Sequence, residues 1–326
     1  MILDVANLSV AFRGESGSRE VLTDVSLTMQ PGEVLGLVGE SGSGKSVTAL
    51  AIMGLLGEQG RITAGHIWLD GQDLTSLGPA AMRAIRGRVA AMIFQEPMTS
   101  LNPLLRVGLQ IEETLHAHLS LSRPEARTRA IRLLADVGIP APHTRIDAYP
   151  YQLSGGMRQR VMIAIAMACA PRLLIADEPT TALDVTIQAQ ILALMQRLRG
   201  EHGTAVLLIT HDMGVIASIA DRVAVMYAGE IVETAPLPEL LARPMHPYAR
   251  LLLAAVPTTR RRVARLPVIE GQMPPPGSVV SGCRFRARCP VSIARCAIDA
   301  PTLAPHGPSR HARCWRAGED VATAAA

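Results

Sequence analysis

The chain has 326 residues, of which 48% are hydrophobic and 18% are charged. This composition excludes a disordered chain, and the length allows one large or two ordinary domains with a buried core. The net charge of +4 divides unevenly, because residues 1–256 carry −3 and residues 257–326 carry +7. A basic terminal segment favours contact with nucleic acid, anionic lipid or another anionic group, although a solvated arginine-rich surface has the same composition.

The hydrophobic residues do not gather into a membrane-spanning segment. The longest candidate run, residues 161–170, is well short of the roughly 18 residues that indicate a membrane helix. Asp4 interrupts the opening of the chain, and no signal-peptide cleavage site follows a hydrophobic run. We therefore expect a cytosolic chain, in which five cysteines at scattered spacing are poor disulfide candidates.

The first elements in chain order are predicted strands. Residues 2–12 and 21–38 read as strands punctuated by turns, and residues 66–70 form another strand that ends at an Asp–Gly turn signal. From residue 79 to residue 139 the pattern becomes helical. It is clearest over residues 124–138, where a glycine follows the last periodic positions.

Two short hydrophobic runs follow, residues 173–176 and 205–210, separated by a helical pattern over residues 185–199. Buried strands that alternate with helices predict an α/β core with a parallel sheet. From residue 236 onward proline accumulates and the periodicity fades. We therefore predict a main domain at 1–235, with a helical subdomain at about 79–165, and an irregular extension at 236–326.

A glycine-rich segment lies between the predicted strand 34–38 and a helical stretch at 47–55, and it fits the phosphate-binding pattern G-x-x-x-x-G-K-S. Its glycines let backbone N–H groups converge on phosphate oxygens, and the helix directs the positive end of its dipole at the same anion. Lys45 is predicted to reach the β and γ phosphates of ATP, and Ser46 to bind magnesium. The predicted ATP-binding residues here are Gly39, Glu40, Ser41, Gly42, Ser43, Gly44, Lys45, Ser46 and Val47.

Lys45 is also the only lysine, against 31 arginines. A general preference for arginine would remove lysine wherever arginine serves as well. Lysine is a compact point charge on a flexible stem, whereas arginine is a planar fork. The surviving lysine therefore marks a site where only a point charge fits.

Asp177 and Glu178 follow the short hydrophobic run 173–176. Two acids at the end of a buried strand favour one carboxylate that holds magnesium through water and one that polarises the attacking water. We assign the first role to Asp177 and the second, catalytic role to Glu178.

Leu153, Ser154, Gly155, Gly156 and Met157 lead into another helical stretch. A Ser-Gly-Gly turn at the start of a helix is a second anion-binding terminus, although Lys45 already serves a phosphate site in the same chain. Together the motifs resemble those of ATP-binding cassette (ABC) ATPases over about residues 2–235. The resemblance implies a P-loop core with a parallel sheet, an antiparallel β subdomain and a helical signature subdomain. It also implies a head-to-tail dimer, in which residues 153–157 close over the ATP of a partner subunit.

Other positions match the same family. By resemblance, Gln95 senses magnesium and the γ-phosphate, and His211 contacts the γ-phosphate. Phe12 is placed against the adenine, although ordinary strand packing would also explain an aromatic residue there. Ala182, Leu183 and Asp184 resemble the loop that crosses the dimer interface. Because Glu178 is retained, we expect a hydrolysis-competent site that uses ATP and Mg²⁺, with Lys45, Gln95, Glu178 and His211 as catalytic residues and Ser46, Gln95 and Asp177 around magnesium.

Two segments favour one branch of the family. Residues 97–103 and residues 246–257 resemble the importers of dipeptides, oligopeptides and nickel. The resemblance implies a motor at the cytoplasmic face of the inner membrane, with two permeases, a second homologous ATPase in a heterodimer and an extracytoplasmic solute-binding protein. A nickel chelate or a glutathione-like peptide is an alternative solute. A nucleic-acid-associated ABC ATPase is the rival class, but only one phosphate loop is present and the helical stretch is too short for a coiled-coil arm.

Four of the five cysteines lie in the basic extension, at positions Cys283, Cys289, Cys296 and Cys314. Thiolates in a proline-rich segment with few hydrophobic residues favour an inorganic crosslink. A [4Fe–4S] cluster suits four thiolates, and its negative charge would suit the arginines at 284, 286, 288, 295, 313 and 316. The segment also resembles the one that holds such a cluster in dipeptide-importer ATPases. Zinc and free thiols remain open, because the spacing alone does not identify a metal.

Overall fold

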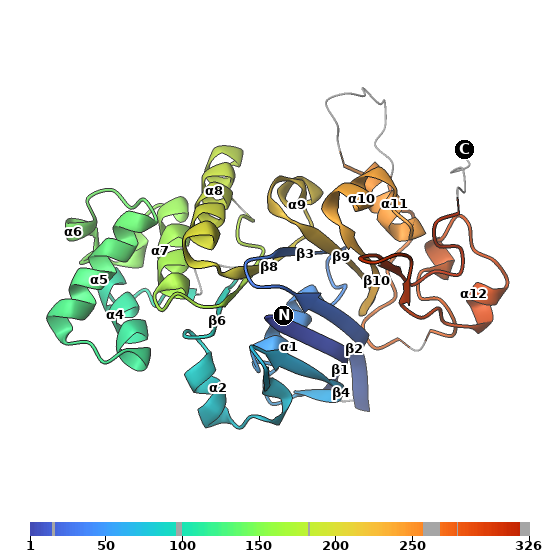
Figure 1. Ribbon diagram of the computed structural model, residues 1–326, viewed down its shortest axis with the longest axis horizontal. Coiled ribbons are helices and arrows are strands. Elements are labelled where there is room, and N and C mark those ends of the chain that lie inside the picture. The colour runs from blue at the N-terminus through green and yellow to red at the C-terminus, as the bar shows by residue number, and fades with distance from the viewer. Residues whose placement is uncertain (15–16, 96–99, 182, 257–267, 279, 320–326) are drawn as a thin grey trace. The chain divides into compact units, whose positions relative to one another are not determined.

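The computed structural model describes residues 1–14, 17–95, 100–181, 183–256, 268–278 and 280–319. The chain forms two compact units, each assembled from several stretches of sequence (Figure 1). The first unit contains Met1–Ile2, Met29–Glu33 and Ser76–Ile209. The second contains Leu3–Thr28, Val34–Thr75 and Thr210–Ala326.

The first unit contains the parallel strands β6 (Ala90–Ile93), β7 (Leu173–Asp177) and β8 (Ala205–Thr210), with β7 in the middle. All residues of β7 and β8 are buried, as expected for parallel strands. Helix α8 (Val185–His202) connects β7 to β8 and forms the crossover that parallel strands require. The predicted parallel sheet is therefore confirmed. The helical pattern over 79–139 is interrupted at β6, where four residues pair with β7.

The remaining helices of the first unit are α2 (Pro79–Ile85), α4 (Val107–His118), α5 (Arg123–Asp136), α6 (Pro142–Arg145) and α7 (Gly155–Met167). A short 3-10 helix, Pro150–Gln152, precedes α7. Helices α4, α5 and α7 contact one another and bury Ile111, Leu115 and Leu134. Helix α5 begins with a capping box between Ser122 and Glu125.

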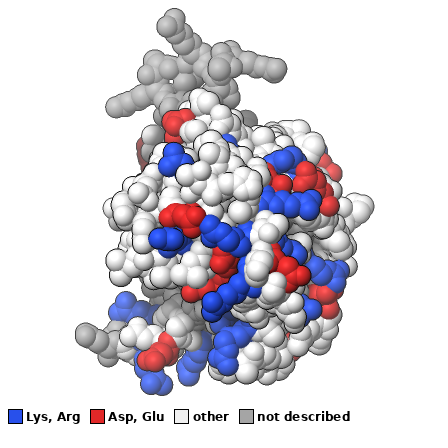
Figure 2. All heavy atoms as spheres, turned by 90° about the vertical axis from the view of Figure 1, so that its left-hand side faces the viewer, with Lys and Arg blue, Asp and Glu red and all other residues white. Residues whose placement is uncertain are grey.

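The outer surface of these helices carries both signs of charge. Figure 2 shows acidic and basic side chains interspersed on this face rather than gathered by sign. Arg127 lies 2.7 Å from the carboxylate of Asp147 and 3.8 Å from that of Glu112. Mixed charges of this kind cancel at a distance, so this face does not present the single-sign field that attracts nucleic acid.

The second unit contains an antiparallel sheet in the order β2, β1, β4, β5. Its strands are β1 (Leu3–Gly14), β2 (Gly17–Met29), β4 (Gly60–Leu69) and β5 (Gln72–Asp73). The short 3-10 helix Leu74–Ser76 follows β5. Alternate residues of β2 are buried towards its end, which is the pattern of a sheet with one covered face.

The second unit also contains β3 (Val34–Val38), β9 (Arg222–Tyr227), β10 (Glu230–Pro236), β12 (His311–Ala312) and β11 (Ala304–Pro305). Strand β3 runs parallel to β9, and the successive pairs β9–β10, β10–β12 and β12–β11 are antiparallel. The helices of this unit are α1 (Lys45–Ile52), α9 (Met213–Ile219), α10 (Leu237–Ala242), α11 (Pro247–Ala254) and α12 (Arg295–Ile298). Two strands of the C-terminal extension thus continue the sheet that begins at the glycine-rich segment.

Aromatic residues are scarce in the chain, at 3%, but several meet in one cluster of the second unit. The rings of Tyr227, Tyr248 and Phe285 have centroids 4.8 to 5.4 Å apart, and His246 lies against Phe285. All four side chains are at most 2% exposed. Because Phe285 belongs to the extension and Tyr227 ends β9, this cluster anchors the extension to the sheet.

Candidate active site

The glycine-rich loop joins β3 to α1, as the sequence predicts. Gly44 stands at the start of α1 with a φ of 109°, which L side chains rarely adopt. A Cβ atom at Gly39 would lie only 2.2 Å from the carbonyl oxygen of Met226 in β9. Ser41 and Gly42 are exposed at the tip of the loop. The two outer glycines therefore allow the loop to lie close to β9, while its tip remains accessible to a ligand.

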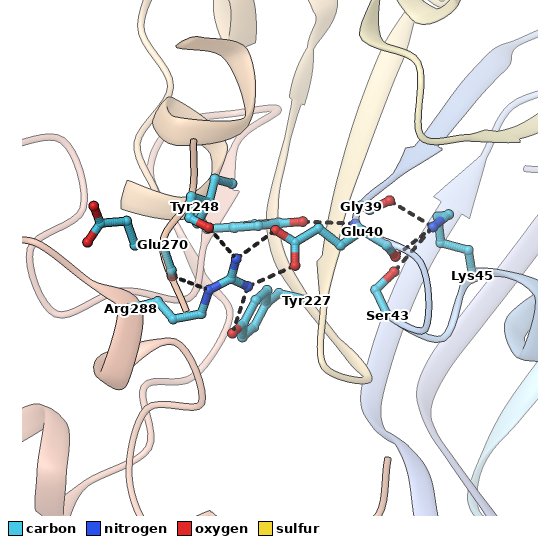
Figure 3. Close-up of polar contacts among 9 residues, drawn as sticks. Gly39, Glu40, Ser43, Lys45, Tyr227, Tyr248, Glu270 and Arg288 are labelled. Carbon is cyan, nitrogen blue, oxygen red and sulfur yellow. Dashed lines mark hydrogen bonds and ion pairs between the residues drawn. The ribbon is translucent and has the colours of Figure 1, made fainter. Parts of the chain in front are cut away.

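Lys45 extends back across this loop. Its Nζ donates hydrogen bonds to the carbonyl oxygens of Gly39 at 2.8 Å and Glu40 at 2.9 Å, and it lies 3.5 Å from the Ser43 hydroxyl (Figure 3). The residue is only 6% exposed. The ammonium group thus lies inside the loop, where its compact shape lets one atom approach several oxygens. Ser46 and Val47 follow in the first turn of α1 and are half-buried.

The acidic pair stands at the end of β7 in the first unit. Asp177 and Glu178 are 5% and 8% exposed. Glu178 has a φ of 50°, an uncommon value for a residue with a side chain. Its N–H donates to the carbonyl oxygen of Ile209 at 2.9 Å, and its carboxylate accepts a hydrogen bond from Thr181. The backbone is thus held in a strained conformation that fixes the direction of the second carboxylate.

Ser154 caps helix α7, and its hydroxyl accepts the N–H of Met157 at 3.3 Å. Leu153 is buried, while Gly155 and Gly156 form the first turn. A Cβ atom at Gly156 would lie 2.9 Å from Cγ2 of Ile187 in α8. The segment therefore forms a helix N-terminus, with a glycine where helix α8 approaches it.

Asp184 caps helix α8 and accepts the N–H of Ile187 at 2.9 Å. Leu183 precedes it and is half-buried, whereas Ala182 lies outside the described residues. Gln95 is exposed just after β6, which pairs in parallel with β7. Because parallel strands end at the same edge, Gln95 and the acidic pair lie at one edge of the sheet. Of the predicted segment 97–103, residues 97–99 are outside the described part of the chain.

Two further predicted residues lie in the second unit with the glycine-rich loop. His211 follows β8 and is exposed. Phe12 is half-buried in β1, opposite Gly60 of β4. The predicted site residues are thus divided between the units: the loop, Phe12, His211 and the four cysteines belong to the second, and Gln95, the acidic pair and the signature segment belong to the first.

The second unit contains a contact that the sequence did not predict. Arg288 of the extension forms a two-pronged ion pair with Glu40 of the glycine-rich loop, with N–O distances of 2.8 and 3.0 Å (Figure 3). This pair raises the pKa of Arg288 further above its already high value. The N–H of Glu40 also donates to the buried hydroxyl of Tyr248 at 2.9 Å. No local sequence signal could have revealed the contact, because residues 40 and 288 are far apart in the chain.

The four cysteines of the extension line one small cavity, together with Phe285, Arg286, Trp315 and Arg316. Burial raises the pKa of Cys283 to about 11, and it also raises the pKa values of Cys289 and Cys314. Among the described residues, no group of three or more His, Cys, Asp or Glu side chains is arranged to hold a metal ion. The cavity gathers the predicted residues but does not itself establish a metal site.

Charge balance at these cysteines involves fewer arginines than the sequence indicated. Arg286 and Arg316 line the cavity. Three others form ion pairs elsewhere in the unit: Arg284 with Glu230, Arg288 with Glu40 and Arg313 with Asp24. For these three, the sequence-based interpretation is corrected, since carboxylates of the cassette are their partners.

No helix within the described residues is long and apolar enough to cross a membrane. Comparison with known families gives two matches: residues 22–181 match the ABC transporter family, and residues 232–296 match the C-terminal region of oligopeptide and dipeptide transporters. Both segments contain residues described above, the first the glycine-rich loop and the acidic pair, and the second three of the four cysteines.

Individual relatives agree with these matches. The chain is 50% identical to a protein of Sinorhizobium fredii named as a probable peptide ABC transporter ATP-binding protein, over 98% of this chain and 96% of the relative. It is 48% identical to the oligopeptide transport ATP-binding protein AppD of Bacillus subtilis, over 98% of both chains. Among solved structures, the dimeric ATP-binding cassette MJ0796 with ADP and phosphate matches with a TM-score of 0.65 at 29% identity. That match covers 72% of this chain and 99% of the cassette.

Proposed function

The chain belongs to the ABC transporter family of ATPases, and we propose that it is the ATP-hydrolysing motor of a membrane importer for dipeptides or oligopeptides. The observation that carries the proposal is the combination, in one chain, of the ABC transporter match with the C-terminal region of oligopeptide and dipeptide transporters. The relatives from Sinorhizobium fredii and Bacillus subtilis carry the names of peptide transport ATP-binding proteins. Their matches to this chain cover almost their whole length.

In this proposal the loop Gly39–Val47 binds the ATP phosphates, with Lys45 at the β and γ phosphates. Ser46, Gln95 and Asp177 hold Mg²⁺, and Glu178 polarises the attacking water. The transfer of a phosphoryl group to water needs little covalent participation from the protein, so positioning and charge stabilisation supply most of the rate. The support is the geometry of each part: a buried ammonium group inside the loop, and two nearly buried carboxylates at the end of β7.

The remaining predicted residues act on the nucleotide from other positions. His211 contacts the γ-phosphate, and Phe12 lies against the adenine. The N-terminus of α7, residues 153–157, and the loop 182–184 engage the ATP of a second, homologous ATPase in a head-to-tail heterodimer. Support comes from the N-terminus of α7, where Ser154 is exposed and the two glycines are half-buried, since a helix N-terminus favours anions. The solved dimeric cassette is consistent with association of such domains.

In this proposal the motor lies at the cytoplasmic face of the inner membrane and acts on two separate permeases, to which an extracytoplasmic solute-binding protein delivers the solute. Residues 1–235 form the nucleotide-binding domain, and 236–326 form an extension of the peptide-transporter type. Nickel chelates or glutathione-like peptides are alternative solutes.

Reconstitution tests this function. The chain would be purified with the two permeases and the second ATPase, placed in proteoliposomes and supplied with the solute-binding protein. We expect ATP-dependent uptake of labelled di- or tripeptides and hydrolysis stimulated by loaded binding protein. Hydrolysis stimulated by nucleic acid, with no response to loaded binding protein, would instead support the rival class.

We further propose that Cys283, Cys289, Cys296 and Cys314 hold a [4Fe–4S] cluster, with zinc as the alternative. Support comes from the shared cavity, which all four cysteines and two arginines line. Because burial raises the pKa values of the Cys283, Cys289 and Cys314 thiols, binding would release protons, and it would crosslink the extension. Visible iron–sulfur absorbance with matching iron and sulfide content would support the cluster. A colourless protein that contains zinc would replace it with the alternative.

A further inference from the structure

All three nitrogen atoms of the Arg288 guanidinium group donate hydrogen bonds. A guanidinium group has five N–H bonds. Its Nη1 and Nη2 atoms donate to the two carboxylate oxygens of Glu40. Nη2 also donates to the carbonyl oxygen of Ile269, Nε donates to that of Glu270, and Nη1 lies 3.4 Å from the Tyr227 hydroxyl. With the side chain only 5% exposed, this environment fixes both the position and the direction of the fork.

Glu40 connects Arg288 to the phosphate-binding loop. Its carboxylate is held by Arg288, its N–H by Tyr248, and its carbonyl oxygen accepts the Nζ of Lys45 at 2.9 Å. All of these residues lie in the second unit and are drawn together in Figure 3. The residue that supports the lysine ammonium group is therefore itself supported on two sides by the C-terminal half of the chain.

The ion pair between Arg288 and Glu40 also changes the charge of the phosphate-binding loop. ATP carries several negative charges, and the carboxylate of Glu40 belongs to the loop that is proposed to bind them. An uncompensated carboxylate there would weaken anion binding, because two like charges near a partly buried surface repel. The ion pair with Arg288 neutralises Glu40 and leaves the positive charge of Lys45 for the phosphates.

We propose that Arg288 is a positioning residue for ATP binding, acting through Glu40 on the phosphate-binding loop. This inference rests on the proposed role of residues 39–47 in ATP binding. Arg288 ends the 3-10 helix Arg286–Arg288, and the next residue is Cys289 of the cysteine cavity. The four-cysteine segment therefore places the residue that orders the nucleotide loop, and the extension is part of the ATP-binding apparatus.

The same unit offers a matched control. Arg310 of the extension pairs with Glu233 of β10 at 3.2 Å, and both side chains are at most 10% exposed. Glu233 also accepts the N–H groups of Met245 and His246. This pair likewise joins the extension to the cassette through a buried Arg–Glu contact, but its described contacts do not include the phosphate-binding loop. Loss of either pair breaks an Arg–Glu contact between the extension and the cassette, so only an effect on the loop distinguishes them.

The experiment measures binding of the fluorescent analogue MANT-ATP, with Mg²⁺, to the purified full-length chain. Arg288→Gln should raise the dissociation constant about tenfold, the scale of a lost charged hydrogen-bond pair. Arg310→Gln should bind as the wild type does. Adding Glu40→Gln to Arg288→Gln should restore part of the affinity, because it removes the unpaired carboxylate. A merely structural role would not produce that rescue.

Wild-type affinity in Arg288→Gln, or an equal loss in Arg310→Gln, would overturn the inference. If Arg288→Gln is insoluble, Arg288→Lys replaces it: the charge is kept but the fork is lost, and we expect a loss of about threefold. Wild-type binding by that variant would also overturn the inference. Lys45→Ala tests the underlying function separately: if it binds MANT-ATP normally, the proposed nucleotide site is wrong, whereas loss there with normal binding in Arg288→Gln refutes only the role of Arg288.

Discussion

Replacing His246 by asparagine should change how the stability of the second unit depends on pH. His246 is 2% exposed, and its Nδ1 accepts the N–H of Tyr248 at 3.0 Å as the cap of α11. Burial, together with the nearby Arg250 and Arg313, lowers its pKa from 6.5 to about 3. Asparagine is among the best capping residues, so His246→Asn keeps an acceptor at the helix start and removes the titrating ring.

The sign follows from where the proton binds. Between about pH 6.5 and pH 3 the unfolded chain binds a proton at this histidine and the folded chain does not, so stability falls as the pH falls. From pH 7.5 to pH 5.5 this loss is about 1.4 kcal/mol, because only the lower half of the interval lies below the unfolded pKa. Burial raises the pKa of the adjacent Glu233, which acts in the opposite direction. Since both proteins keep Glu233, its contribution cancels in their difference.

Urea unfolding followed by tryptophan fluorescence provides the assay. Both tryptophans, Trp68 and Trp315, lie in the second unit with His246. We expect the free energy of unfolding of the wild type, relative to His246→Asn, to be about 1.4 kcal/mol lower at pH 5.5 than at pH 7.5. The exposed His66 supplies the control, since His66→Asn should not remove this loss. A difference between wild type and His246→Asn that is equal at both pH values would refute a buried, neutral His246.

Three further predictions concern the nucleotide site. Glu178→Gln should keep MANT-ATP binding and lower phosphate release by about 100-fold or more, because a carboxylate no longer polarises water; normal steady-state turnover would exclude Glu178 from that role. Lys45→Arg should impair ATP binding or hydrolysis, since a planar fork replaces a point charge inside the loop, and unchanged activity in both assays would contradict this. Gly39→Ala places a Cβ atom 2.2 Å from the Met226 carbonyl oxygen, so we expect a loss of about 2 kcal/mol or more in unfolding free energy. Gly200→Ala is its control: nothing lies within 4 Å of that Cβ, and the change should stabilise helix α8 by up to about 1 kcal/mol.

Several parts of the predicted site have a local geometry that is built by residues close together in the sequence. The glycine-rich loop is specified by glycines at backbone positions that need them, next to a buried strand and a helix. The acidic pair is specified by its place after four hydrophobic residues. Ser154 and Asp184 are helix caps, and a cap is determined within three residues. In each case the residues that create the geometry are neighbours in the sequence.

The fold departs from the sequence prediction where tertiary pairing outweighs local pattern. Strand β6 is only four residues long, and it exists because it pairs with β7, more than 80 residues later in the chain. Strands β11 and β12 have two residues each: β12 pairs with β10, and β11 pairs with β12. Their segment reads as irregular by itself. Short strands contain too few residues to show periodicity, so their prediction needs knowledge of the partner strand.

The ion-pair partners of the arginines in the extension were likewise not predictable from the local sequence. In the sequence these arginines lie next to cysteines, which suggests that they balance the negative charge of a metal cluster. In the folded chain Arg288 reaches a carboxylate of the phosphate-binding loop, and Arg313 reaches Asp24 in β2. Charge composition was therefore informative about the segment, but the partner of each charge depends on the sheet that brings the extension back to the cassette.

Lys45, the single lysine, and Arg288 both contact Glu40, and each contact requires its own residue type. Lys45 contacts the carbonyl oxygen of this residue, and Arg288 contacts its carboxylate. The carboxylate presents two oxygens to a rigid fork, which arginine satisfies and lysine does not. The carbonyl oxygens of Gly39 and Glu40 instead accept from a compact donor, and in the proposed site this donor turns towards phosphate when ATP binds. We therefore expect that neither arginine at position 45 nor lysine at position 288 would make the same contacts. This explains why the chain uses arginine elsewhere but lysine at position 45.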